Sequence, residues 1–229
     1  MLKIMPKATL FFFLLLLAPL LSLSQAQNQE DAAGKKQGKW IKSYRYGNVR
    51  YNGQFRDDRP YGQFKYFYES GALQAVTDYS DDGVIAQTQT FHENGAPMAE
   101  GKYIRQKKEG KWLYYSDIDS SLVAEENYKK GVLHGKSINY YPETGKPTES
   151  FEYIDGKKEG PYLKFFPDGS TMTKGTYKND LLDSDFTLYY PNGKTELKGQ
   201  YKNGDQVGNW NYFDEEGNAI EEEDFKNND

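Results

Sequence analysis

A short aromatic-rich unit recurs through this chain, and its spacing is the feature that most restricts the fold. Six clear copies open with a glycine, at Gly38, Gly62, Gly110, Gly135, Gly160 and Gly208. The intervals between neighbouring glycines are 24, 48, 25, 25 and 48 residues, close to one period or to two. Halving the long intervals places weaker copies at Ala86 and Ser184, which makes eight units. A tandem period of this length predicts a repeat architecture.

Each unit holds two strand-like stretches separated by turns. The stretch from Lys194 to Lys202 alternates charged or amide side chains with Thr, Leu, Gly and Tyr, which predicts a strand with one solvated face. Asn203 and Gly204 follow it and accept the positive φ of a tight hairpin turn. One aromatic per unit keeps its register along the chain: Phe55, Tyr79, Tyr103, Tyr128, Tyr153, Tyr177, Tyr201 and Phe225.

These units predict an all-β fold, because none has room for the helix that a parallel crossover needs. We expect an elongated, twisted antiparallel β-meander built from about eight tandem 24–25-residue hairpin repeats. A propeller with two units per blade is the alternative, although the units do not alternate in pairs. The repeat domain is expected over residues 38–229, and residues 27–37, which lack aromatics and periodicity, are expected to form a flexible leader.

The N-terminal residues have the organisation of a secretory signal peptide. Lys3 and Lys7 precede an uncharged apolar run from Leu10 to Leu17, and Ser24-Gln25-Ala26 supplies small residues for cleavage before Gln27. We therefore predict a signal peptide over residues 1–26 and a periplasmic, envelope-associated or secreted protein, with an uncleaved anchor as the alternative. No later stretch is apolar for long enough to cross a bilayer as a helix.

Composition narrows the partners and the chemistry. The chain has no cysteine, which excludes disulfides, thiolate metal sites and a cysteine nucleophile. Its net charge of −5 argues against nucleic acid or an anionic membrane surface as the main partner.

No group of residues predicts catalysis, a metal or a cofactor. The two histidines, His92 and His134, lie in different units, and neither has a nearby Ser and Asp with which to form a nucleophilic triad. The stretch Gly131 to Ser137 has three residues between its glycines where a phosphate-binding loop has four, and its glycines are those of the repeat. Short acidic runs such as Asp117-Ile118-Asp119 are better explained as turns than as calcium loops. We therefore predict a non-enzymatic protein.

Two stretches carry a family resemblance. Tyr51-x-Gly53-x-Phe55 leading to Gly62-x-Phe64, and Gly199-x-Tyr201-x-x-Gly204 leading to Gly208-x-Trp210, resemble the MORN repeat, specifically the variant found in bacterial proteins of the YwqK-type antitoxin family. The resemblance extends over about residues 38–229. It implies a β-hairpin array that works by contact, as a scaffold or a protein-binding surface. An antitoxin-like inhibitor is an alternative, although a cytoplasmic antitoxin would not need an export segment.

A second resemblance gives another class of function. Gly110-Lys111-Trp112-Leu113-Tyr114-Tyr115 is similar to cell-wall-binding repeats of the choline- and glucan-binding kind. Those repeats use aromatics to cage quaternary ammonium or to stack on sugars. This resemblance implies a carbohydrate-binding or cell-wall-binding module as the alternative function.

Neighbouring aromatics make the candidate binding surface. Successive strand residues point to opposite faces, so adjacent aromatic pairs cannot all pack on one side and some aromatic surface should be exposed. Such a surface suits an unidentified protein partner or, as the alternative, a cell-wall glycan. Dimerisation through an unpaired edge strand also stays open. The candidate partner-binding residues are Tyr66, Tyr68, Trp112, Tyr114, Tyr141, Tyr190 and Tyr212.

Overall fold

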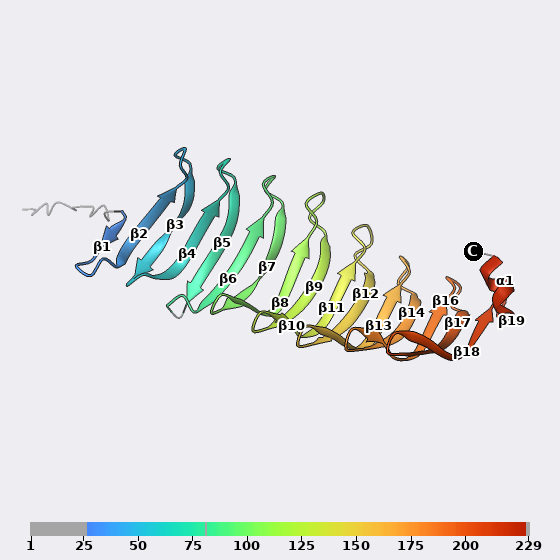
Figure 1. Ribbon diagram of the computed structural model, residues 1–229. Helices are drawn as coiled ribbons and strands as arrows, with labels where there is room; N and C mark the ends of the chain where they lie inside the picture. The colour runs from blue at the N-terminus through green and yellow to red at the C-terminus, as the bar shows by residue number, and fades with distance from the viewer. Residues whose placement is uncertain (1–26, 81, 228–229) are drawn as a thin grey trace, which may run out of the picture.

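The computed structural model describes residues 27–80 and 82–227 and consists of one long, open β-sheet (Figure 1). The strands follow one another along the ribbon from the N-terminal end to the C-terminal end, and a short helix closes the C-terminal end. The predicted signal peptide, residues 1–26, lies outside the described residues.

The elements, in chain order, have the following bounds. They are β1 (Gln29–Glu30), β2 (Lys36–Ser43), β3 (Val49–Arg56), β4 (Arg59–Phe67), β5 (Leu73–Ser80), β6 (Ile85–Phe91), β7 (Pro97–Ile104), β8 (Lys107–Tyr115), β9 (Leu122–Lys129), β10 (Val132–Leu133), β11 (Gly135–Tyr140), β12 (Pro147–Ile154), β13 (Lys157–Phe165), β14 (Thr171–Lys178), β15 (Leu181–Leu182), β16 (Ser184–Tyr189), β17 (Thr195–Lys202), β18 (Asp205–Phe213), β19 (Ala219–Ile220) and α1 (Glu222–Asn227).

Every pairing in the sheet is antiparallel and joins strands that follow one another in the chain. The short β10 and β11 both pair with β9, and β15 and β16 both pair with β14, so each pair is one strand interrupted by a single residue. The two ends of the sheet lie far apart and do not close (Figure 1). The predicted antiparallel meander is therefore confirmed, and the propeller is not formed.

The glycine that opens a unit forms a bulge in the unit's first strand. Gly62 has a φ of +65° and lies where the β3–β4 register shifts. Ser184 opens its unit with a φ of 84°, an uncommon conformation for a residue with a side chain. At Ala86 the β5–β6 register runs without a shift. The bulge therefore depends on a residue that adopts positive φ.

A single layer of sheet leaves little room for a core. Six apolar side chains of the described residues are fully buried: Phe64, Ala75, Ala86, Ala99, Trp112 and Phe151. Large rings cross one side of the sheet and meet edge to face, as in the pair Phe64–Tyr79, with ring centroids 5.1 Å apart and planes at 80°. Aromatic side chains can bury enough area to stabilise such a thin sheet.

Two features at the ends differ from the predictions. Residues 27–37, expected to form a flexible leader, include β1, which pairs with the start of β2 and extends the sheet by one short strand. Asn28 fixes the next part of this edge, because its Oδ1 accepts a hydrogen bond of 2.7 Å from the Ile41 backbone N–H. The lack of aromatics in the leader therefore did not prevent it from covering an edge strand.

The eighth unit ends in a helix where the repeat predicts a second strand. The first turn of α1 holds Glu222, Glu223 and Asp224, which favour the N-terminal end of a helix over a strand. Lys226 pairs with Glu222 at 2.6 Å, one helical turn away. Phe225 is therefore not in the strand register expected for it, although its ring still packs 5.0 Å from that of Tyr212. Within the described residues, α1 is too short to cross a membrane, and no longer helix is present.

Candidate binding surface

One side of the sheet, here called the aromatic face, carries a central row composed mainly of large rings and small residues. Antiparallel pairing places directly opposed residues on the same side of the sheet. The row crosses every unit because the repeat keeps its register. Its members are Trp40, Gly53, Phe64, Thr77, Thr88, Gly101, Trp112, Glu126, Ser137, Phe151, Tyr162, Gly175, Phe186, Gly199 and Trp210.

The glycines of this row let rings lie flat on the backbone. A β-carbon added at Gly53 would be 2.4 Å from the ring of Phe64, and one at Gly101 would be 2.3 Å from the indole of Trp112. Both distances are too short for any side chain. The glycine that the sequence places in the second strand is therefore a packing site for the first ring of the next unit.

A second row on the aromatic face is formed by the once-per-unit aromatics. Tyr103 meets Trp112 edge to face at 4.8 Å, and Tyr201 meets Trp210 in the same way at 5.1 Å. These tyrosines are half-buried, and within the described residues no second layer covers them. The aromatic face is therefore a partly exposed surface on which the rings form several separate groups.

Four of the seven predicted partner-binding residues lie on this face. Trp112 is only 2% exposed and donates its indole N–H to the backbone oxygen of Lys102 at 3.2 Å. This candidate residue is therefore buried, because Gly101 lets the indole lie on the sheet. Tyr66, Tyr114 and Tyr212 are half-buried among neighbouring rings.

The other three predicted residues lie in the loops between the two strands of a unit. The hydroxyl groups of Tyr68, Tyr141 and Tyr190 each donate a hydrogen bond to a backbone oxygen of the next unit, at 2.8, 2.9 and 2.8 Å. Tyr44 makes the same contact at 2.8 Å. The second member of an adjacent aromatic pair therefore joins consecutive units, a role that spacing alone did not indicate.

The fourth unit places an ammonium group among its rings. Lys108 Nζ lies 4.5 Å from the ring of Trp112, 5.0 Å from that of Tyr114 and 4.7 Å from that of Tyr128. It also lies 2.6 Å from the Tyr114 hydroxyl. Burial lowers the pKa of Lys108, while the carboxylate of Glu126 opposes that shift. Burial also raises the pKa of Tyr128 to about 12, so the ring stays neutral at physiological pH.

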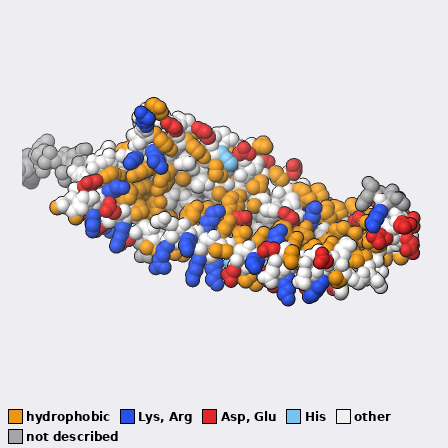
Figure 2. Space-filling model, in the orientation of Figure 1, with side chains coloured by type: hydrophobic (Ala, Val, Ile, Leu, Met, Phe, Trp, Pro, Cys, Tyr) orange, Lys and Arg blue, Asp and Glu red, His pale blue; other side chains and the backbone are white. Residues whose placement is uncertain are grey.

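The two long edges of the ribbon differ in charge. Figure 2 shows Lys and Arg projecting from the lower edge with Asp and Glu among them, and Asp and Glu gathered at the C-terminal end. The upper loops join the two strands of a unit, and their acidic residues are Glu69, Glu93, Asp117, Asp119, Glu143, Asp168, Asp214, Glu215 and Glu216. The lower turns join consecutive units and carry both charges: Asp57, Asp58, Asp82, Asp155 and Asp180 lie beside Arg105 and Lys130. The strand ends that flank these turns add Arg56, Arg59, Lys107, Lys129, Lys157, Lys178 and Lys202. The upper loops are therefore mostly acidic, and the lower edge is mixed in charge.

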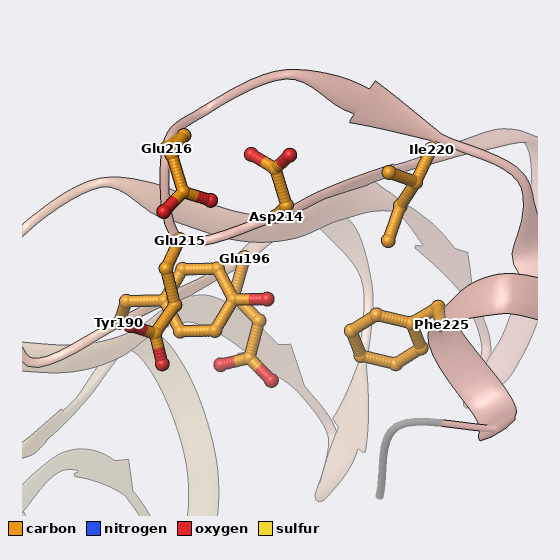
Figure 3. A pocket seen from close by; sticks show the side chains of 7 residues that line it. All are labelled: Tyr190, Glu196, Asp214, Glu215, Glu216, Ile220 and Phe225. Carbon is orange, nitrogen blue, oxygen red and sulfur yellow. The ribbon is translucent and has the colours of Figure 1, made fainter.

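A hollow of 470 Å³ lies at the C-terminal end of the ribbon (Figure 3). Ile220 and Phe225 face one another on one side, and the carboxylates of Glu196 and Glu215 lie near the ring of Tyr190. Asp214 and Glu216 complete its acidic lining. Within residues 27–80 and 82–227 these carboxylates do not form a cluster that could hold a metal ion.

The two histidines lie in separate loops. His92 is half-buried in an upper loop, and its Nε2 has no hydrogen-bond partner among the described residues. His134 Nδ1 lies 3.4 Å from a carboxylate oxygen of Asp155, a contact between consecutive turns that sequence inspection did not anticipate. A histidine–carboxylate pair of this kind has no nucleophile beside it in these turns.

The fold defines a class of protein, a β-hairpin repeat protein. Residues 158–179 and 182–203, which fall in the sixth and seventh units, match the family model described as MORN repeat variant. The chain therefore contains this repeat at residues 158–203. No curated protein matches the chain.

Two solved structures show a partial likeness. A mutant of S. aureus TarM in complex with fondaparinux, alpha-GlcNAc-glycerol and UDP is 16% identical, with a TM-score of 0.32 over 43% of this chain and 19% of that chain. TarM in a second structure is 18% identical, with a TM-score of 0.32 over 42% of this chain and 19% of that chain. The match thus spans about a fifth of TarM and carries no argument about function.

Proposed function

We propose that this protein is a non-catalytic, exported binding or scaffold protein whose aromatic face receives a protein partner. The observation that supports this proposal most is the uncovered aromatic face, which runs along the ribbon as half-buried tyrosines such as Tyr103, Tyr153 and Tyr177. Tyrosine is enriched at protein interfaces because its ring supplies apolar area and its hydroxyl tolerates water.

The many charges along both edges support a protein partner over a glycan. Acidic upper loops and a lower edge of mixed charge would pair with complementary charges on a folded partner. A cell-wall glycan is the weaker alternative because Trp112, the residue on which that resemblance depended, is buried against Gly101. An antitoxin-like inhibitor of the YwqK type would be a special case of protein binding by the same face.

Introducing positive charge on one face of the sheet tests the proposal. The aromatic-face variant Tyr153→Lys with Tyr177→Lys is compared with the polar-face variant Glu152→Lys with Thr176→Lys, in the same two strands. Each tagged protein is crosslinked in its native host, purified and weighed by mass spectrometry, with circular dichroism to check folding. We expect one stoichiometric partner with the polar-face variant and its loss with the aromatic-face variant. Equal recovery with both variants would refute the proposal.

Export has a separate test. The proposed signal peptide predicts a mature chain that begins at Gln27. Intact-mass measurement of the protein from its host would show that start if the proposal holds. A chain found only in the cytoplasm with Met1 retained would contradict it.

A further inference from the structure

Three lysines of the sheet each place an ammonium over aromatic rings of the same unit or of the unit before it. The lysine always stands two residues before the opening glycine: Lys36, Lys108 and Lys158. Lys36 Nζ lies 4.8 Å from the ring of Phe55, and Lys158 Nζ lies 3.7 Å from that of Phe151. The faces of aromatic rings attract cations. The repeat therefore builds a cation-accepting position into its architecture.

The fourth unit shows the fullest form of this cage. Its walls are Trp112, Tyr114 and Tyr128, each with its ring centroid 4.5–5.0 Å from Lys108 Nζ. The two tyrosine hydroxyls lie 3.2 Å apart and connect the walls. Glu126 adds a carboxylate, whose oxygen accepts a hydrogen bond of 2.5 Å from Tyr128.

The second unit has the same walls without the lysine. Phe64, Tyr66 and Tyr79 stand at the equivalent positions, and the hydroxyls of Tyr66 and Tyr79 lie 2.9 Å apart. Pro60 occupies the position two residues before Gly62, so no ammonium is supplied from within the unit. Among the described residues, no lysine or arginine nitrogen lies over the rings of these three walls.

An open hollow marks this position. It has a volume of 220 Å³ and lies on the aromatic face. Its lining is almost wholly aromatic: Tyr51, Phe55, Pro60, Phe64, Tyr66 and Tyr79. Burial and the hydrogen bond with Tyr79 raise the pKa of Tyr66, so its phenol stays neutral. The hollow is thus a cage of neutral rings.

The lining also indicates which cation suits the cage. In the fourth unit, Glu126 faces Trp112 across the strands and helps to compensate the ammonium of Lys108. Thr77 faces Phe64 at the same position of the second unit and carries no charge. A primary ammonium is strongly hydrated and needs hydrogen-bond acceptors when it leaves water. A quaternary ammonium has no N–H to satisfy, and aromatic cages are the sites that proteins use for it.

We propose that Tyr51, Phe64, Tyr66 and Tyr79 form a binding site for a small, soluble quaternary ammonium compound, beside the Phe55 ring over which Lys36 already lies. The ring faces complement its charge as they complement that of Lys108 in the fourth unit. The site goes beyond the proposed protein-binding function and does not depend on it. It rests on the likeness between the aromatic walls of the second unit and those of the fourth.

Binding to the unmodified protein is the first test. Choline is titrated into the full mature chain by isothermal calorimetry, in parallel with its neutral isostere, in which carbon replaces the quaternary nitrogen. Since a cation–π contribution of this kind corresponds to about a 3-fold to 30-fold change in affinity, we expect choline to bind at least about 3-fold more tightly than the isostere. No saturable choline binding, or equal binding of the two compounds, would overturn the proposal.

Variants then locate the site. Pro60→Lys should place an internal ammonium in the cage, as Lys108 does in the fourth unit, and should weaken choline binding by about tenfold or more. Leu133→Lys is the matched control, because it adds the same charge at the same repeat position of the fifth unit, where the wall positions hold Ser137 and Asn139. Choline binding should survive Leu133→Lys within about twofold. Retained binding in Pro60→Lys, or equal loss in both variants, would place the cation elsewhere and overturn the assignment.

Discussion

Trp112 lies against the backbone of Gly101, and a β-carbon at Gly101 would be only 2.3 Å from the indole. The contact joins the fourth unit to the third through a position where the chain cannot carry a side chain. It explains why the second strand of several units holds a glycine on the buried side of a sheet, where glycine is otherwise unfavourable.

Gly101→Ala should therefore destabilise the protein by about 1–3 kcal/mol, the usual cost of overpacking a fixed core. Gly175→Ala is the matched control, because its β-carbon would be 3.1 Å from Phe186, a distance that a small ring movement relieves. The midpoint of chemical denaturation, followed by tryptophan fluorescence, should fall clearly further for Gly101→Ala. An unchanged denaturation midpoint in Gly101→Ala would mean that the indole does not lie on the glycine.

The tyrosine hydrogen bonds that join consecutive units give a second prediction. Tyr141→Phe removes the hydroxyl that donates to the Phe165 backbone oxygen at 2.9 Å. Losing this hydrogen bond should cost about 0.5–1.5 kcal/mol. Tyr46→Phe is the control, since Tyr46 is 82% exposed. Removing its hydroxyl should leave the denaturation midpoint unchanged. Equal effects of the two substitutions would argue against a stabilising hydrogen bond between Tyr141 and Phe165.

The bulge at the start of each unit predicts opposite effects of one substitution. Ser184 has a φ of 84°, so Ser184→Gly should relieve backbone strain and stabilise the protein by about 1 kcal/mol. Ala86 stands at the same repeat position in a regular strand pairing, so Ala86→Gly should destabilise by about 0.5–1 kcal/mol. Thermal unfolding of both variants measures the signs. If Ser184→Gly also destabilises, the bulge geometry is not the reason for glycine at this position.

Repeat spacing predicted the architecture because both strands of a unit depend on local signals. The alternation from Lys194 to Lys202 and the turn at Asn203–Gly204 became β17 and its hairpin, with positive φ at both turn residues. The aromatic register is kept from Phe55 to Tyr201 on the aromatic face. It is lost at Phe225, where the acidic run favours a helix over the strand that the period implies.

The candidate surface was less predictable because it depends on contacts between units. Alternation places Tyr66 and Phe67 on opposite sides, but it does not reveal that Tyr68 reaches the backbone of the next unit. Pro60 also carried no signal in the sequence alone. Its significance becomes visible only when Lys108 is seen lying over the equivalent rings of another unit.

Acid should weaken the C-terminal units through Asp183. This buried carboxylate accepts a hydrogen bond of 3.2 Å from the backbone N–H of Asn203 and lies 3.3 Å from Lys202 Nζ, and these contacts lower its pKa. Because the folded-state pKa is depressed, the stabilisation is present above the unfolded value of about 3.9 and is lost as the pH falls through the folded value.

Asp183→Asn should therefore lower stability at pH values near neutral, and the difference from the unmodified protein should shrink below about pH 4. Urea denaturation across this pH range measures the effect. Exposed Asp205 serves as the control through Asp205→Asn. A constant difference at every pH would show that the charge of Asp183 is not what stabilises the turn.

Partner contact by the aromatic face is the central claim, and site-specific photo-crosslinking in the native host tests it most directly. A photoreactive phenylalanine derivative replaces either Tyr201 on the aromatic face or its neighbour Gln200 on the polar face of the same strand. Both probes then sample the same cell and the same expression level. We expect one discrete covalent adduct from position 201 and none from position 200. Adducts of equal yield from both positions, or from position 200 alone, would contradict the account.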